Sequence, residues 1–415
     1  MKNHTSRKKT ITLNFTEAGD GQVFLVASVQ GNTAASLAAG DAYAQVGDIL
    51  KEKGLQIVQE RIFGSLSVEH QVRAARTSAF QERDVPTDTP LTYIEGHPPW
   101  GEGLSGLIVR AVAVFKQGDE IWPIKDEGQP CGRGWCRNGV TFIILQNIQG
   151  IEKGPARINT PAVQVQRVID RAEQILQTQG LSYRDVVRTW FYLADILKWY
   201  DEFNQVRNGK YRDFGLMPAT NTDPLLLPAS TGIQGITPQR SACAMDLIAV
   251  SLNDDARPTV VQMTNQKQRD AFYYGSSFSR GAFIKEPDVS LIEVSGTAAI
   301  GATGMSLYQG DIKGQVKCTF DIIENLISQR GARLEDICAG TVFLKHPEYL
   351  APFSTIAEER GLDIRSCVCV VADVCREDLL FELDAEVVFD HSQSHKVTEA
   401  QSNRGTKGQS NRGTK

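Results

Sequence analysis

An arginine and a glutamate in the C-terminal part of this 415-residue chain are the side chains best suited to chemistry. Arg365 stands at the head of one apolar strand, and Glu382 lies inside the next, in Phe381-Glu-Leu-Asp-Ala. If these two strands pair, a fixed cation and a fixed acid face one pocket. Together they can hold a substrate carboxylate with a guanidinium fork and move a proton beside it. We therefore predict a site for a small-molecule carboxylate in which both residues take part.

The segments that would position this pair occur twice in the chain. Each copy predicts an amphipathic helix that ends at a glycine, a short link, a buried strand and, farther on, a second strand. Internal similarity of this kind indicates repeated structural units. The corresponding segments are residues 170–180 and 321–331, residues 191–193 and 342–344, and residues 245–249 and 381–385.

A third and weaker copy is predicted at the N-terminus, where an apolar strand also enters a glycine-containing turn. Its segments are a strand at 23–31, a helix at 38–53, a strand at 57–63 and a final strand at 106–115. The predicted fold class is α/β, with tandem units that each contain a mixed sheet with helices packed on one face. Three such units in one chain can form an internal pseudo-trimer.

The predicted boundaries follow the polar and glycine-rich stretches between the copies. They give a degenerate first unit at 1–135, a second unit with a degenerate site at 136–255, and a third unit with the active site at 256–390. Residues 391–415 form a tail in which Gln401–Lys407 recurs as Gln409–Lys415. This repeat has no apolar residue to bury, so the tail is predicted to be disordered.

The copies differ at the proposed site. Aligned by sequence alone, Ala229 matches Arg365 and Asp246 matches Glu382, while the first copy has apolar residues and glycine there. Arg365 and Glu382 could instead form a structural ion pair at a strand end. Since the unit persists in a copy without them, we favour a functional role.

These segments resemble the Rid (YjgF/UK114) family, and more closely its tandem branch, the chorismatases, which include 3-hydroxybenzoate synthases. The resemblance covers about residues 140 to 390 and is strongest at its last motif. It is carried by Arg188-Thr-Trp-Phe-Tyr-Leu, Pro228-Ala-Ser-Thr-Gly-Ile, Tyr274-Gly-Ser-Ser-Phe-Ser-Arg280, Ser295-Gly-Thr-Ala-Ala-Ile, Gly310-Asp-Ile-Lys-Gly-Gln and Arg376-Glu-Asp-Leu-Leu-Phe-Glu382.

The resemblance implies a reaction and a set of residues. Glu382 would donate a proton to the enolpyruvyl methylene of chorismate, after which pyruvate leaves, and Gly296 would influence the outcome as in the 3-hydroxybenzoate-forming type. A carboxylic acid that is neutral near pH 7 needs a raised pKa, which burial among apolar strand residues supplies. The residues expected to bind substrate are Arg365, Arg280, Tyr274, Gly275, Phe278, Gly296, Thr297, Cys367 and Cys369.

Two other functions stay open at this point. The chain keeps the Rid-type Arg365, and Tyr274-Gly275 is not preceded by the Tyr-Pro found in chorismatases. Both features favour the wider Rid family, whose members hydrolyse imines and enamines. A third hypothesis is a regulatory protein in which Arg365 binds a carboxylate and Glu382 does no chemistry.

Composition limits the partners. The net charge of -5 and the absence of a basic stripe argue against nucleic acid, and no apolar stretch is long enough for a membrane span. The eight cysteines, without a secretory signal, indicate reduced thiols and a cytoplasmic location. Cys131 and Cys136 lack further ligands for zinc, so we expect neither metal nor cofactor. The expected assembly is a monomeric pseudo-trimer or a homo-oligomer such as a trimer.

Overall fold

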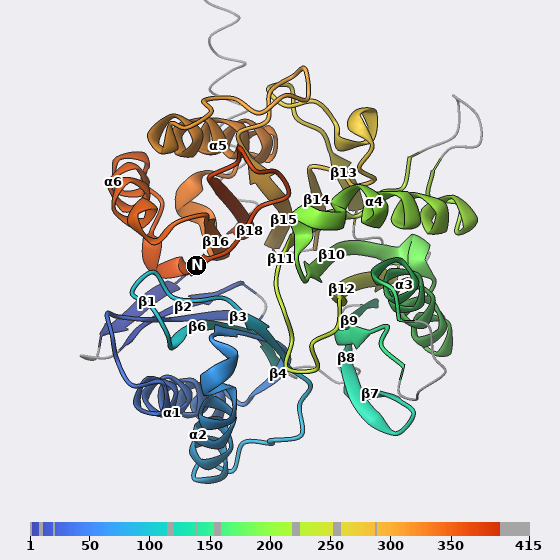
Figure 1. The fold of residues 1–415 in the computed structure, drawn as a ribbon. Coiled ribbons are helices and arrows are strands. Elements are labelled where there is room, and N and C mark those ends of the chain that lie inside the picture. The colour runs from blue at the N-terminus through green and yellow to red at the C-terminus, as the bar shows by residue number, and fades with distance from the viewer. Residues whose placement is uncertain are drawn as a thin grey trace, which may run out of the picture.

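Three six-stranded sheets arranged around a common centre make up the protein. The computed structural model describes residues 2–7, 11–19, 21–113, 120–137, 139–152, 159–217, 225–251, 259–286 and 289–390. The helices lie on the outside of the three sheets, and the sheets face the centre (Figure 1). The predicted fold class, tandem α/β units in a pseudo-trimer, is confirmed.

The first unit has its strands in the order β1-β2-β3-β6-β4-β5, with β4 and β5 parallel and the other neighbours antiparallel. The weak N-terminal resemblance thus corresponds to a complete unit. Its elements are β1 (Lys2–Arg7), β2 (Ile11–Glu17), β3 (Gln22–Val29), α1 (Ala35–Lys53), β4 (Leu55–Gly64), α2 (Glu69–Gln81), β5 (Thr92–Glu95) and β6 (Leu104–Ala113).

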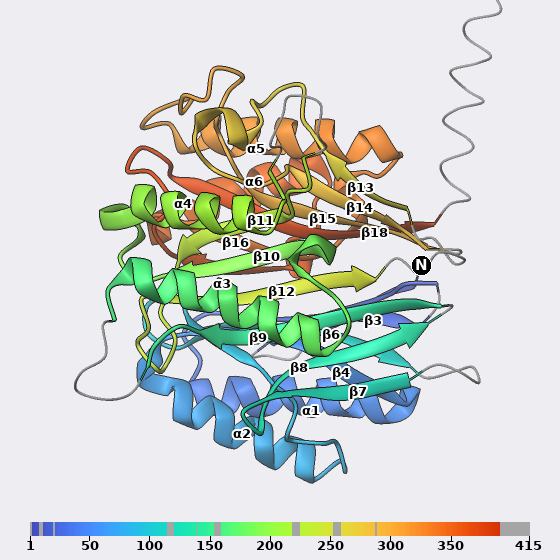
Figure 2. The same cartoon turned by 90° about the vertical axis from the view of Figure 1, so that its right-hand side faces the viewer.

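The second unit repeats this topology in the order β7-β8-β9-β12-β10-β11. Its sheet begins at Glu120, so the predicted boundary at residue 135 is wrong: it would cut β8, which pairs with β9 of the same sheet. The elements are β7 (Glu120–Asp126), β8 (Gln129–Arg137), β9 (Val140–Gln149), α3 (Pro161–Thr178), β10 (Val186–Leu193), α4 (Ile196–Asp213), β11 (Ala229–Gln234) and β12 (Cys243–Ser251). Figure 2 shows α3 and α4 along the outer face of this sheet.

The third unit has the order β13-β14-β15-β18-β16-β17. Its long helix begins at an Asp311 cap, whose carboxylate accepts from Gly314 N at 3.0 Å. The elements are β13 (Thr259–Met263), β14 (Gly281–Lys285), β15 (Val289–Ala298), α5 (Ile312–Ile327), β16 (Ile337–Leu344), α6 (Leu350–Arg360), β17 (Cys367–Val371) and β18 (Phe381–Asp390). The predicted tail, 391–415, lies outside the described residues.

Each sheet buries both faces. The outer faces pack on their own helices in three separate apolar cores, and the inner faces share a fourth core at the centre. Because strand side chains alternate between faces, Phe381, Leu383 and Ala385 of β18 join the outer core. Glu382 and Asp384 therefore project from the inner face.

The strand pairing behind our first prediction is wrong. In the third sheet β16 lies between β17 and β18, so the strand after Arg365 does not pair with the strand that contains Glu382. The side chains of Arg365 and Glu382 line two different cavities, which are described below.

The register also corrects the match between the copies. A bulge interrupts the pairing at the same place in β4, β10 and β16, which aligns the three strands. With this alignment Asp384 corresponds to Asp246, and Glu382 corresponds to Ala244 and Gly106. Likewise Pro228, one residue before Ala229, takes the place of Arg365.

Candidate active site

A cavity of about 810 Å³ lies between the second and third units. The second unit supplies one wall, from α4 and from Ser230 and Gly232 of β11. The third unit supplies the other wall from β15, from β18 and from the segments before β14 and β18. Neither unit forms this cavity alone, because both units contribute lining residues.

Glu382 lies on the inner face of β18 and lines this cavity. Its side chain is buried, and it makes no hydrogen bond or ion pair with any other residue that the structure describes. Burial, followed by the charge of Asp384, raises the pKa of Glu382 to about 8, against the opposing effect of Arg188 and Arg280. The carboxyl group is therefore protonated at neutral pH and free to donate.

Gly296 leaves the space that the Glu382 carboxyl occupies. It lies in a β-bulge of β15, where the pairing with β18 shifts between Val294 and Thr297. A Cβ atom on Gly296 would come within 2.1 Å of Glu382 Oε1 and 3.2 Å of Thr231 Cγ2. Any other residue here would have to displace the acid.

Two buried arginines line the cavity, and both lie close to the Phe278 ring. The guanidinium carbon of Arg280 lies 5.2 Å from the centre of the Phe278 ring, and that of Arg207 lies 5.6 Å from it. Arg207 donates to Asn204 Oδ1 at 2.6 Å and to Ser230 Oγ at 3.5 Å. Within the described ranges no carboxylate forms an ion pair with it. A buried guanidinium without a counter-charge is a strong anion site.

The structure brings together five of the predicted residues. Thr297 is buried beside the cavity and donates to Ser295 O at 2.8 Å, but it does not line the wall. The side chain of Tyr274 lies outside the described part of the chain. The residues found in the cavity wall are Glu382, Arg280, Gly275, Phe278 and Gly296.

Arg365, Cys367 and Cys369 lie in another hollow, between the first and third units, with a volume of about 560 Å³. There Arg365 Nε and Nη2 each donate to the Asp363 carboxylate at 2.7 Å. Hydrogen bonds from Arg365 hold the pKa of Asp363 below its usual value, despite partial burial that acts in the opposite direction. Burial raises the pKa of Cys367 to about 12, so this thiol is no nucleophile. The expectation that these residues share a pocket with Glu382 is not met.

Sequence reasoning missed the wall supplied by the second unit, and above all Arg207. A signal for it was present. Phe203, Arg207 and Tyr211 recur every four residues on α4, so the arginine lies on the buried face of an amphipathic helix. A charged residue at such a position indicates either a buried ion pair or a ligand.

Comparisons with known proteins give a consistent result, although no family model matches the chain. A chorismatase of Streptomyces rapamycinicus is 29% identical over 230 residues, which are 50% of this chain and 65% of the relative. A chorismatase of Streptomyces hygroscopicus is 25% identical over 237 residues, 51% of this chain and 63% of that protein. The alignments thus span less than two thirds of each relative.

A chorismatase crystal structure has the same fold. It superimposes with a TM-score of 0.56 at 18% identity, over 80% of this chain and 93% of that one. The chain is chorismatase-like. The findings support the predicted similarity to the chorismatases.

Among the described residues no cluster of three or more His, Cys, Asp or Glu side chains is arranged to hold a metal ion. In the same part of the chain, every helix is too short or too polar to cross a membrane.

Proposed function

We propose that this protein cleaves the enolpyruvyl ether of chorismate, or of a related carboxylated cyclic substrate, and releases pyruvate, with Glu382 as the proton donor. The observation that carries the proposal is the Glu382 carboxyl group, which is buried, without a partner among the described residues, and in the wall of a cavity that the buried Arg207 and Arg280 also line. The chorismatase relatives supply the reaction class.

The reaction needs a neutral acid at the methylene carbon. Glu382 donates its proton to this carbon, and positive charge develops on the neighbouring carbon, which bears the ether oxygen. Water adds to that carbon and returns a proton to Glu382. The hemiketal then breaks its bond to the ring oxygen, and pyruvate and the ring alcohol leave. Because the pKa of Glu382 is about 8, the donor is in its protonated form at physiological pH.

The substrate carboxylates would pair with the two arginines. Arg207 of the second unit and Arg280 of the third unit both contact the Phe278 ring, so the cavity combines an apolar ring with two cationic positions. A planar carbocyclic dianion matches this pattern, because each guanidinium can bind one carboxylate through two parallel hydrogen bonds. The cavity volume of about 810 Å³ is in the ordinary range for small-molecule sites.

Imine or enamine hydrolysis is the weaker hypothesis on this geometry. It relied on Arg365 as the carboxylate anchor next to Glu382, and Arg365 instead binds Asp363 in the other hollow. The non-catalytic hypothesis relied on the same residue and is weakened for the same reason.

The test is to incubate the purified protein with chorismate and follow pyruvate with a lactate dehydrogenase coupled assay, beside the Glu382→Gln variant. Pyruvate from the wild type and not from the variant is the expected result. Undiminished turnover by the variant would remove Glu382 from the mechanism. No pyruvate from either protein would overturn the chorismate proposal, and imine substrates and ligand-binding assays would then decide between the other two hypotheses.

A further inference from the structure

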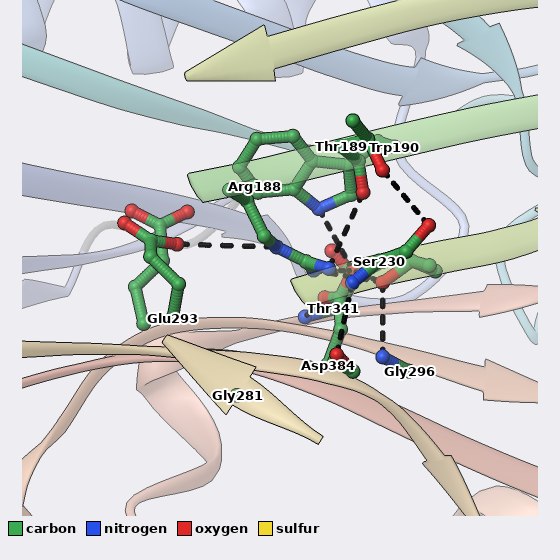
Figure 3. Close-up of polar contacts among 12 residues, drawn as sticks. Arg188, Thr189, Trp190, Ser230, Gly281, Glu293, Gly296, Thr341 and Asp384 are labelled. Atoms are coloured by element: carbon green, nitrogen blue, oxygen red, sulfur yellow. Dashed lines mark hydrogen bonds and ion pairs between the residues drawn. The ribbon is translucent and has the colours of Figure 1, made fainter. Parts of the chain in front are cut away.

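A buried polar network joins the second unit to the strand that carries Glu382 (Figure 3). At its centre is Asp384, two residues beyond Glu382 on the same inner face of β18. Three side chains of the second unit reach its Oδ2 atom: Arg188 Nη2 at 3.2 Å, Trp190 Nε1 at 3.0 Å and Thr231 Oγ1 at 2.9 Å. Its other oxygen accepts from Thr341 N at 3.1 Å.

The same network extends to the bulge beside the acid. Thr231 Oγ1 accepts from Gly296 N at 3.1 Å while it donates to Asp384. Ser230 N, one residue earlier on β11, donates to Ser295 Oγ at 2.9 Å. The bulge that makes room for Glu382 is therefore tied to the second unit by direct hydrogen bonds, and through Thr231 to Asp384.

We propose that Asp384 is a positioning residue of this site: held by Arg188, Trp190 and Thr231, it fixes a negative charge beside Glu382 and keeps that acid protonated at neutral pH. The inference rests on the proposed role of Glu382 as the proton donor. Asp384 itself does not line the cavity and does not touch the reacting atoms.

Charge balance around Glu382 gives the direction of the effect. The charged groups that act on Glu382 are Asp384 on its own strand, Arg188 on β10 and Arg280 before β14. The other charged residues of the cavity wall are Lys198, Asp201, Glu202 and Arg207 on α4 and Arg376 before β18. Of the charges that act on Glu382, Arg188 and Arg280 favour the ionised form of the acid. The pKa of the neighbouring Cys375 thiol is raised by burial and by Glu382, so that thiol stays neutral. Asp384 is therefore the negative charge that opposes ionisation of Glu382.

The chain contains a matched control for this idea. Asp246 occupies the corresponding position on β12 of the second unit, in the interface with the first unit. It accepts from Thr92 Oγ1 at 2.6 Å and from Asn147 N at 2.7 Å. Thr92 corresponds to Thr231, and Asn147 lies in the equivalent bulge. Yet the residue at the place of Glu382 in that unit is Ala244, so no acid is present to tune.

The test follows the carboxylic acid C=O stretch of Glu382 by infrared difference spectroscopy, with the band assigned by its loss in Glu382→Gln. In the wild type the band should titrate near pH 8. In Asp384→Asn we expect the midpoint to move at least one pH unit lower, because the repulsion is lost and Arg188 remains. Asp246→Asn should keep the wild-type midpoint.

An unchanged midpoint in Asp384→Asn, or an equal shift in Asp246→Asn, would overturn the proposal. If Asp384→Asn does not fold, Thr231→Val replaces it, with a smaller downward shift expected and Thr231→Ser restoring the wild-type value. A Thr231→Val midpoint at the wild-type value would then contradict the proposal. Because this measurement needs no substrate, its outcome is independent of the chorismate assay. With an active enzyme, the alkaline limb of kcat/KM should move by the same amount.

Discussion

Two interfaces of the molecule each contain a buried arginine from the equivalent outer helix of a unit, but the two arginines have different partners. At the interface of the first and second units, Arg76 of α2 binds Glu60 of β4 through Nε at 2.9 Å and Nη2 at 2.8 Å. At the interface of the second and third units, Arg207 of α4 has no such carboxylate, because the strand position that corresponds to Glu60 is Thr189. Both guanidinium groups are buried.

The two interfaces differ in how the positive charge of the buried guanidinium group is neutralised. Burying an arginine without a counter-charge costs several kcal/mol, so a paired arginine is the ordinary structural solution. The first unit adopts that solution. The second unit leaves the charge open in a cavity wall, and the third unit places a neutral acid opposite. This difference supports the proposal that Arg207 binds a carboxylate of the substrate.

The third interface completes the comparison. Between the first and third units, the position of Glu382 is Gly106, where a Cβ atom would come within 2.4 Å of Ala27 O. Arg365 is present in that hollow, but Asp363 already neutralises it. Among the described residues, the interface of the second and third units thus has the neutral acid Glu382 and an arginine without a carboxylate partner. The other two interfaces each have an arginine that is paired with a carboxylate.

The largest expected effect on kcat comes from a change at Glu382, because the corresponding positions in the other two units are Ala244 and Gly106. Glu382→Gln keeps the shape of the side chain and removes the proton donor, so kcat should fall by roughly 100- to 10,000-fold. Asp246→Asn, at the corresponding surface of the second unit, should retain wild-type kcat. The measurement is pyruvate release from chorismate at saturating substrate, and equal losses in the two variants would contradict the distinction between the interfaces.

Much of this framework could be predicted from sequence, since the repeated units carry local signals. The helix predicted at 38–53 is α1, Ala35–Lys53, and the strand predicted at 57–63 is β4, Leu55–Gly64. The strand predicted to contain Glu382 is β18, Phe381–Asp390. Periodicity determines such features because each depends on residues close together in the chain.

The register and the site walls could not be predicted in the same way. The segments that join the last two strands differ in length between the second and third units, so an alignment at constant offset matched Asp246 with Glu382 and not with Asp384. Arg207 and Glu382 come from different units, and their proximity depends on how whole sheets pack. Arg365 follows a family motif, but the strand between β17 and β18 separates it from the acid.

A pair of arginine variants sharpens the contrast between the two interfaces. Arg207→Met should raise KM for the substrate by roughly 10- to 150-fold, the equivalent of about 1.5–3 kcal/mol for a lost charged hydrogen bond. Its thermal stability should be equal to or above that of the wild type, because an unpaired buried charge is removed.

Arg76→Met should behave in the opposite way. It leaves the Glu60 carboxylate buried and unpaired, which costs about 3–5 kcal/mol of unfolding free energy, with KM unchanged in the protein that stays folded. Urea unfolding and steady-state kinetics measure both quantities. A stability loss in Arg207→Met as large as that in Arg76→Met would mean that both arginines are structural.

The pH dependence of stability should also differ between the interfaces. The folded-state pKa of Glu382 is raised from 4.5 to about 8, so its contribution is fully present below pH 4.5 and is lost as pH rises through 8. Relative to Glu382→Gln, the wild type should lose about 1.4 kcal/mol per pH unit at most within that window. For Asp246, whose pKa is raised to about 6 by burial, the corresponding loss ends two units lower. Urea unfolding between pH 5 and pH 9 checks both windows, and parallel curves for wild type and Glu382→Gln would contradict the buried neutral acid.

The smallest effect on activity is expected from a change at Arg365, the residue that the sequence resemblance had suggested as the anion-binding group. Arg365→Ala removes a half-exposed guanidinium that already binds Asp363, outside the cavity that contains Glu382. We therefore expect less than a twofold change in KM and kcat and little change in stability, since partly exposed ion pairs contribute about 0–1 kcal/mol. Arg280→Met is the positive control, because Arg280 lies in the wall of the Glu382 cavity and its loss should raise KM as Arg207→Met does. A large loss of activity in Arg365→Ala would return the substrate carboxylate to the interface of the first and third units. It would also mean that a family motif predicted the anion site better than the packing of the three sheets does.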